Sequence, residues 1–154
     1  MNEHVQVTGL KRGVTRYPHY DAAELGFENY WYPVMLSRKL DEGKPVALTL
    51  FGQRMMFYRE KGRPYALQDR CPHRGVKISL GKQEFPGTWS CPYHGWTFDL
   101  NSGKVVAALT DGPTSKVCGN AGVRTFPVEE RAGLVWVFYG TIPPPPIEDD
   151  EPKR

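Results

Sequence analysis

This chain of 154 residues contains few cysteines and little net charge. Three of its residues are cysteines and its net charge is +3, with lysines and arginines scattered along the sequence rather than clustered. A nucleic-acid surface is therefore not indicated. No apolar stretch approaches the roughly 20 residues of a membrane-spanning helix, and Glu3 lies where a signal peptide would be apolar. We expect a cytoplasmic protein with no membrane segment and no nucleic-acid partner.

Aromatic residues are plentiful, by contrast, with four Trp, eight Tyr and seven Phe, so that a packed core is expected. The length corresponds to one domain. Long helical periodicity and internal repeats are both absent, and short apolar runs are separated by turn residues. The sequence therefore predicts an all-β fold, an antiparallel β-sandwich. The expected strands are 30–37, 46–51, 54–59, 64–68, 88–91, 97–100, 104–107, 123–128 and 134–139.

Three segments are expected along the chain. Residues 1–28 are polar and irregular, with one short helical turn at 21–25. Residues 29–141 form the folded domain. Residues 142–154 form a proline-rich and acidic linker or tail, since four consecutive prolines favour an extended, semi-rigid spacer.

Two short motifs contain the chemistry: Cys71-Pro72-His73 and Cys91-Pro92-Tyr93-His94, with seventeen residues between His73 and Cys91. Two thiols and two imidazoles in two mixed loops are the ligand set of a Rieske [2Fe-2S] centre. One iron would take Cys71 and Cys91, and the other His73 and His94. Neutral imidazoles in place of two thiolates remove negative charge, which makes the one-electron reduced form easier to reach.

A structural zinc site is the alternative interpretation, because two cysteines and two histidines also satisfy tetrahedral zinc. Zinc sites usually group cysteines in one loop and histidines in the other. Each loop here carries one of each, which favours the iron–sulfur interpretation. A visible absorption spectrum would distinguish the two.

Longer stretches around these ligands resemble a known family. They include Cys71-Pro72-His73-Arg74-Gly75 and Cys91-Pro92-Tyr93-His94-Gly95-Trp96, with further similarity from about residue 29 to residue 140. These stretches resemble the N-terminal Rieske domain of ring-hydroxylating (Rieske non-haem iron) oxygenases. The resemblance implies a Rieske-type sandwich with a small cluster-binding subdomain formed by the two ligand loops.

Two departures from the respiratory type of Rieske protein refine this resemblance. Val76 and Tyr93 occupy the places of two cysteines that form a disulfide in the respiratory type, and Cys118 is left as a free thiol without a partner. Trp96 stands where that type has a serine whose hydroxyl donates to a sulfide. We therefore predict a reduction potential in the lower part of the Rieske range of about −150 to +300 mV.

The resemblance implies one-electron transfer within an aromatic-ring hydroxylating or demethylating oxygenase, a monooxygenase or dioxygenase. The donor would be an NAD(P)H-dependent reductase or a ferredoxin, and the acceptor a catalytic domain or subunit with a mononuclear iron. This chain lacks the two histidines and carboxylate of such an iron site; His19-Tyr20-Asp21 has no suitable third ligand nearby. The chain alone is therefore expected to transfer electrons without catalysing hydroxylation. A freestanding Rieske-type ferredoxin is the alternative.

Overall fold

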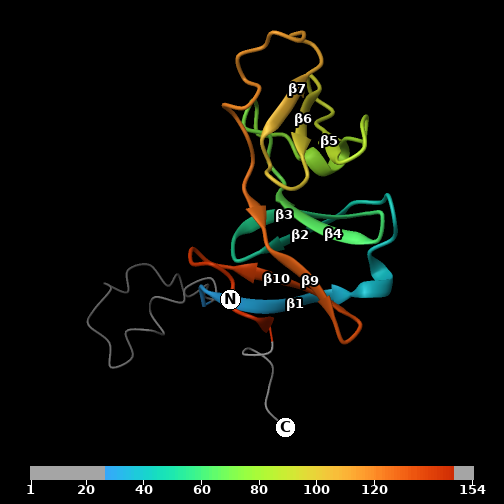
Figure 1. Cartoon of the computed structure of the whole chain (residues 1–154), viewed down its shortest axis with the longest axis vertical. Helices are drawn as coiled ribbons and strands as arrows, with labels where there is room; N and C mark the ends of the chain where they lie inside the picture. The colour runs from blue at the N-terminus through green and yellow to red at the C-terminus, as the bar shows by residue number, and fades with distance from the viewer. Residues whose placement is uncertain (1–26, 148–154) are drawn as a thin grey trace, which may run out of the picture.

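The computed structural model describes residues 27–147, which form three antiparallel sheets and two short 3₁₀ turns (Figure 1). The expected helical turn at 21–25 and the histidines at 4 and 19 lie outside these residues. The first sheet has the order β1-β10-β9 and the second the order β2-β3-β4-β8, while β5-β6-β7 make the third. Their bounds are β1 Tyr30–Leu36, β2 Val46–Leu50, β3 Gln53–Glu60, β4 Arg63–Gln68, β5 Thr88–Ser90, β6 Trp96–Asp99, β7 Val105–Ala108, β8 Thr125–Phe126, β9 Val128–Arg131 and β10 Leu134–Tyr139, with η1 at Ser37–Lys39 and η2 at Ile78–Leu80.

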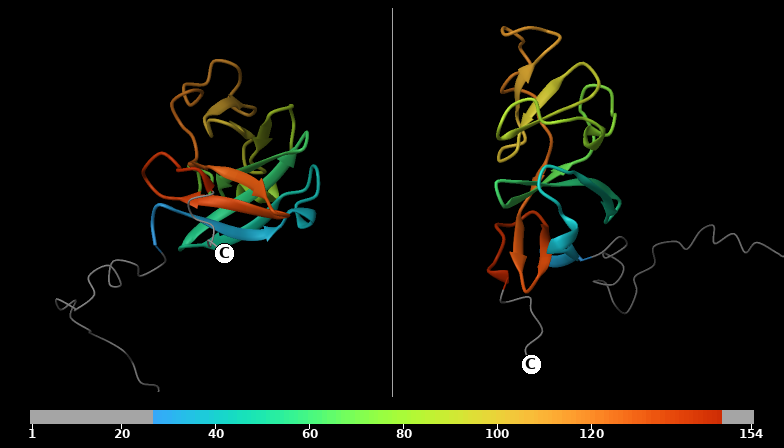
Figure 2. Two further views of the ribbon diagram at one scale, coloured as in Figure 1. Left: turned by 60° about the horizontal axis from the view of Figure 1, so that its bottom comes forward. Right: turned by 90° about the vertical axis from the view of Figure 1, so that its right-hand side faces the viewer.

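The three sheets follow one another as layers along the long axis of the molecule (Figure 2). The first and second sheets enclose one core, to which Phe57 and Val137 belong. This arrangement confirms the predicted all-β antiparallel sandwich. Among the described residues, no helix is long and apolar enough to cross a membrane.

Strand β3 explains how the third sheet is attached. Its residues 55–58 are all almost completely buried, although successive side chains of a strand point to opposite faces. Met55 and Phe57 enter the core of the sandwich, whereas Met56 and Tyr58 enter a second core that also contains Cys71 and Cys91. The middle sheet is therefore covered on both faces, and the ligand-bearing part packs on its outer face.

The prediction of one continuous strand at 123–128 is wrong. The structure divides it into β8, which pairs with β4 in the second sheet, and β9, which pairs with β10 in the first. Pro127 lies between them and has no N–H group to continue a ladder, while its carbonyl oxygen accepts a bond from Phe138 N–H at 2.9 Å. The proline marks the point where the chain changes sheets.

The proline-rich segment begins against the domain. The indole N–H of Trp31 donates to the Pro145 carbonyl oxygen at 2.8 Å. Ile147 is 3% exposed and packs with Trp31, Trp136 and Phe138. The domain boundaries at 28/29 and 141/142 stay predictions.

Arg59 of β3 joins the two sheets of the sandwich. Its guanidinium donates to the Leu40 carbonyl oxygen at 2.8 Å and to that of Ser37 at 3.3 Å, and it forms an ion pair with Glu130 of β9. The hydrogen bond from Arg59 is the main cause that lowers the pKa of the Glu130 carboxyl below its usual 4.5. Ionised Glu130 therefore stabilises the fold above that pH, and this contribution is lost as the pH falls through the folded-state pKa.

We expect Glu130→Gln to unfold more easily than the wild type at pH 7, by up to about 1 kcal/mol because the pair is partly exposed. The difference should shrink as the pH is lowered below 4.5. Chemical denaturation at several pH values measures it, and Glu129→Gln, on the same strand, is the matched control. A difference that persists unchanged at low pH would contradict the role assigned to the Glu130 charge.

Candidate metal centre

The first ligand loop connects β4 to η2. Gly75 N–H donates to the Cys71 carbonyl oxygen and Cys71 N–H to the Val76 carbonyl oxygen, both at 2.8 Å. Gly75 has a φ of 74°, a left-handed conformation that glycine adopts without steric cost. These two bonds close a tight turn that holds Cys71 and His73 on one short segment.

The second ligand loop connects β5 to β6. Cys91 N–H donates to the Trp96 carbonyl oxygen at 2.8 Å, and two consecutive residues, His94 (φ 68°) and Gly95 (φ 66°), are left-handed. A Cβ at Gly95 would lie 2.8 Å from the Cβ of Leu109. The Thr110 hydroxyl donates a hydrogen bond to the His94 carbonyl oxygen at 2.8 Å, and this bond stabilises the strained backbone conformation of His94.

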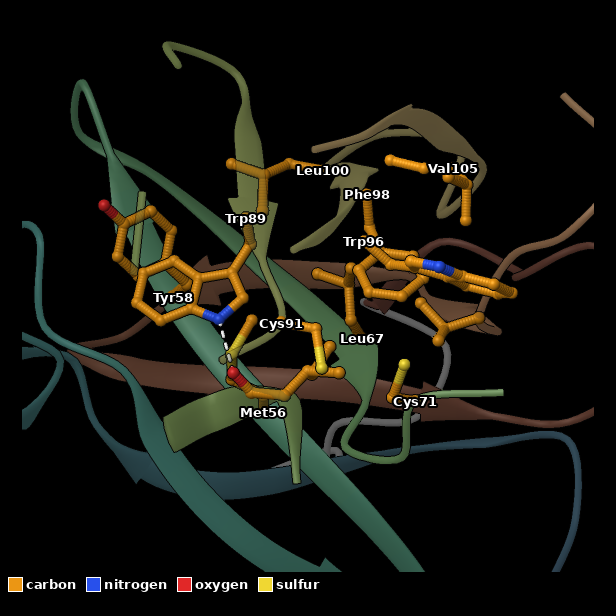
Figure 3. Packing of buried hydrophobic residues seen from close by; sticks show 13 residues of the cluster. Met56, Tyr58, Leu67, Cys71, Trp89, Cys91, Trp96, Phe98, Leu100 and Val105 are labelled. Atoms are coloured by element: carbon orange, nitrogen blue, oxygen red, sulfur yellow. Dashed lines mark hydrogen bonds between the residues drawn. The ribbon is translucent and has the colours of Figure 1, made fainter. Parts of the chain in front are cut away.

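The loops sort the four predicted ligands by type. Cys71 and Cys91 are 1% and 3% exposed and belong to the same buried cluster, side by side below Trp96 (Figure 3). The His73 and His94 rings meet at 4.8 Å between centroids. His94 is exposed and His73 half-buried. The thiols thus face the interior of the protein and the imidazoles its outer edge.

Two aromatic residues flank the imidazoles. Trp96 stacks on His73 with a centroid distance of 4.8 Å and an interplanar angle of 16°. Tyr93 contacts His94 at 4.6 Å but is 55% exposed. Trp96 therefore both packs the loops and shields one imidazole from water, whereas Tyr93 adds apolar surface beside the other.

The donor atoms fit a metal cluster. The Nδ1 atom of His73 is buried and has no hydrogen-bond partner among residues 27–147, and a buried polar atom without a partner is costly unless it ligates something. Burial, with the neighbouring Cys71 thiol as a smaller cause, raises the pKa of Cys91 to about 11. Such a thiol becomes a thiolate when a metal cation replaces its proton.

The geometry also bears on the zinc alternative. The four candidates form a thiol pair in one buried cluster and an imidazole pair with ring centroids 4.8 Å apart. Such an arrangement suits two metals with two protein ligands each. This arrangement agrees with the iron–sulfur interpretation.

Sequence reasoning missed two residues that hold the first loop. Asp69 is 1% exposed, and its carboxylate accepts bonds from the Ser79 N–H at 2.8 Å and the Ser79 hydroxyl at 2.7 Å. The backbone carbonyl oxygen of Arg54 accepts a hydrogen bond from the Asp69 N–H at 2.8 Å. The guanidinium of Arg54 donates a hydrogen bond to the Gly75 carbonyl oxygen at 3.2 Å. Arg54 therefore spans the loop from before Cys71 to after His73. In the sequence, only the expected pairing of the strands at 54–59 and 64–68 could have indicated this role of Arg54, because that pairing places Arg54 opposite Asp69.

We expect Arg54→Met to weaken this support by roughly 1.5 kcal/mol, the lower value for a hydrogen bond to a charged group. Cluster release to a chelator should accelerate, and the reduction potential should fall because a nearby positive charge favours the more negative reduced form. Arg54→Lys, the control, keeps the charge but not the fork-shaped donor. Equal potentials in Met, Lys and wild-type proteins would rule out an electrostatic role for Arg54.

Comparison with known proteins agrees with this geometry. The sequence profile described as the Rieske [2Fe-2S] domain matches residues 30–127. The chain belongs to the Rieske [2Fe-2S] domain family. The cofactor of this Rieske domain is therefore a Rieske [2Fe-2S] cluster, a centre that takes up and releases single electrons.

The relatives of this Rieske domain include terminal oxygenase components. It is 44% identical over 134 residues to the terminal oxygenase component CarAa of carbazole 1,9a-dioxygenase from Sphingomonas sp, covering 86% of this chain and 35% of that protein. It is 40% identical to chlorophyllide a oxygenase of Chlamydomonas reinhardtii, covering 76% of this chain and 17% of that protein. The chain thus spans about a third or less of the length of these curated relatives.

Solved structures show the same similarity. The terminal oxygenase of carbazole 1,9a-dioxygenase from Novosphingobium sp. KA1 superposes with a TM-score of 0.83 at 42% identity, covering 88% of this chain and 36% of that one. A reduced complex between oxygenase and ferredoxin in carbazole 1,9a-dioxygenase gives a TM-score of 0.83 at 40% identity, covering 89% and 36%. This Rieske domain is homologous to the electron-accepting domain of such terminal components.

Proposed function

We propose that this protein is the electron-accepting part of a Rieske non-haem iron oxygenase. Cys71 and Cys91 would hold one iron of the cluster, and His73 and His94 would hold the other. The observation that carries the proposal is the sorting of these ligands, with buried thiols and imidazoles at the outer edge. Electrons cross short distances most readily, so the imidazole edge is where a partner exchanges them.

The residues around the cluster have different roles. The two thiolates anchor the cluster in the dry second core, while Trp96 excludes water from one face of His73. His94 is exposed and provides the contact edge, because its outer nitrogen can donate a hydrogen bond to a partner's carboxylate.

The relatives support the partners that we propose. The proposed donor is an NAD(P)H-dependent reductase or a ferredoxin, since related oxygenase structures contain a bound ferredoxin. The proposed acceptor is a catalytic domain or subunit with a mononuclear iron, because the chain spans only about a third of terminal components. We place the protein in the cytoplasm, in keeping with its few cysteines.

A reductive titration followed by visible and electron paramagnetic resonance spectra tests the proposal. We expect about two irons per chain, uptake of one electron, and a potential below zero within the Rieske range. A colourless protein, or one metal ion per chain, would refute it. The reading frame beyond codon 154 tests the oxygenase assignment separately: an extension with two histidines and an acid supports it, and a stop codon favours a freestanding ferredoxin.

A further inference from the structure

The loop that carries Cys71 and His73 also carries three exposed cations: Arg70, Arg74 and Lys77. None of the three forms an ion pair with another residue in the part of the chain that the structure describes. The one carboxylate of this loop, Asp69, is buried and bonded to Ser79. Three positive charges therefore face solvent beside the ligands with no acidic side chain at the surface of the loop.

The surface on the other side of the ligands is different. Lys82 is paired with Glu84 at 2.9 Å, so its charge is locally balanced. Leu80, Tyr93 and Leu109 are exposed there, and this side is mainly apolar. Of these two sides, the first ligand loop therefore carries the unpaired positive charges.

The cations border a hollow that reaches a ligand. A cavity of about 380 Å³ is lined by Arg70, Arg74 and His73, together with Cys71 and Gly75. The side chain of Arg70 lies against Gly75, with its Nε 3.4 Å from where a Cβ would stand there. Arg54 donates to the carbonyl oxygen of the same glycine. Two guanidinium groups thus meet at the backbone that immediately follows His73 and Arg74.

We propose that this cationic surface, Arg70, Arg74 and Lys77, docks an acidic electron-donor protein over His73. The inference rests on the proposed function. It assigns the surface to the donor because a donor diffuses to the oxygenase as a separate protein, and electrostatic steering accelerates only partners that must find one another. An acceptor domain joined to the chain gains nothing from steering. The donor is oxidised by one electron and this protein is reduced by one.

The test uses the cluster-loaded protein and the variant Arg70→Gln/Arg74→Gln/Lys77→Gln. The matched control is Arg38→Gln/Lys39→Gln/Lys44→Gln, which removes three exposed charges from the β1–β2 connection in the sandwich. Stopped-flow absorbance follows oxidation of the reduced proteins by two small probes, anionic iron(III)–EDTA and cationic hexaammineruthenium(III). The ratio of the two rates reports charge at the exchange edge, because any change in reduction potential affects both rates alike.

We expect the anion-to-cation rate ratio of the triple variant to fall about tenfold or more at low ionic strength, and the gap to narrow at high salt. Reduction by a dithionite-reduced [2Fe-2S] ferredoxin of net negative charge should slow by a similar factor. The control variant should stay within about twofold of the wild type, the scatter expected for distant, screened charges.

A rate ratio that does not change in the triple variant, or that changes equally in the control, overturns the inference and leaves the proposed function intact. A protein whose spectrum does not change on reduction refutes the proposed function itself. The acidic residues 148–151 of this chain are the competing occupant. If replacing these four residues by the corresponding amides raises the rate of oxidation by iron(III)–EDTA as much as the triple substitution lowers that rate, the acidic segment, and not a donor protein, is the occupant of the cationic surface.

Discussion

Cys71→Ser and Cys91→Ser are each expected to abolish the visible spectrum and lower the iron content from about two atoms per chain to near zero. Each thiol is almost completely buried in the same core, so no water-exposed residue can replace it as a ligand. Serine is a poor, hard donor for iron bridged by sulfide. Iron and sulfide analysis with the absorption spectrum measures the effect.

Cys118→Ser is the matched control for these variants. Cys118 is a free, half-buried thiol that packs against the second core but lies outside both ligand loops. The same sulfur-to-oxygen change there should leave the iron content and the spectrum unaltered. If Cys118→Ser removes the cluster, or if Cys91→Ser retains it, the assignment of Cys71 and Cys91 as ligands is wrong.

The second large effect is expected for Gly81→Ala, which should destabilise the protein by about 3 kcal/mol and prevent cluster retention. A Cβ at Gly81 would overlap the Ser90 carbonyl oxygen. Ser90 and Lys82 form paired backbone bonds, with Ser90 N–H donating to the Lys82 carbonyl oxygen at 2.8 Å. This contact joins the segment after the first ligand loop to the strand before the second, so the methyl group would push the two loops apart.

Gly112→Ala separates this collision from backbone strain. Gly112 is left-handed with a φ of 87°, but a Cβ there meets nothing within 4 Å. Its replacement should cost only the strain of about 1–2 kcal/mol and keep the cluster. Gly81 has a φ of −85°, so it lies outside the left-handed region that causes the strain at Gly112. Thermal unfolding and visible spectra of both variants distinguish the collision from backbone strain. Similar losses of stability and of cluster in both variants would show that the contact between the loops is unimportant.

The cluster type and most strands were predictable because both depend on short-range patterns. Each ligand pair lies within four residues, and the loop bonds that hold Cys71 and Cys91 are equally local. The hairpin of β2 and β3 was predicted with its turn displaced by one residue. Phe51 and Gly52 are both left-handed, and Leu50 pairs with Gln53, as a two-residue turn requires.

The supporting residues were not predictable in the same way. Arg54 had no interpretable role in the sequence, because its contact with Gly75 spans 21 residues. The strand expected at 123–128 failed for a related reason. Apolar alternation indicates that a segment is extended, but it does not say which sheet each half joins.

The sequence by itself determined the type of cluster, the pairing of one cysteine with one histidine in each candidate ligand loop and the all-β class. These depend on donor chemistry and on periodicity, which neighbouring residues encode. Only the tertiary structure decided that both thiols face inward while the imidazoles face outward, and that three cations without an ion pair among residues 27–147 border the site. The reason is physical: burial and charge balance depend on which distant segments fold against each loop, and β3, covered on both faces, brings those segments together.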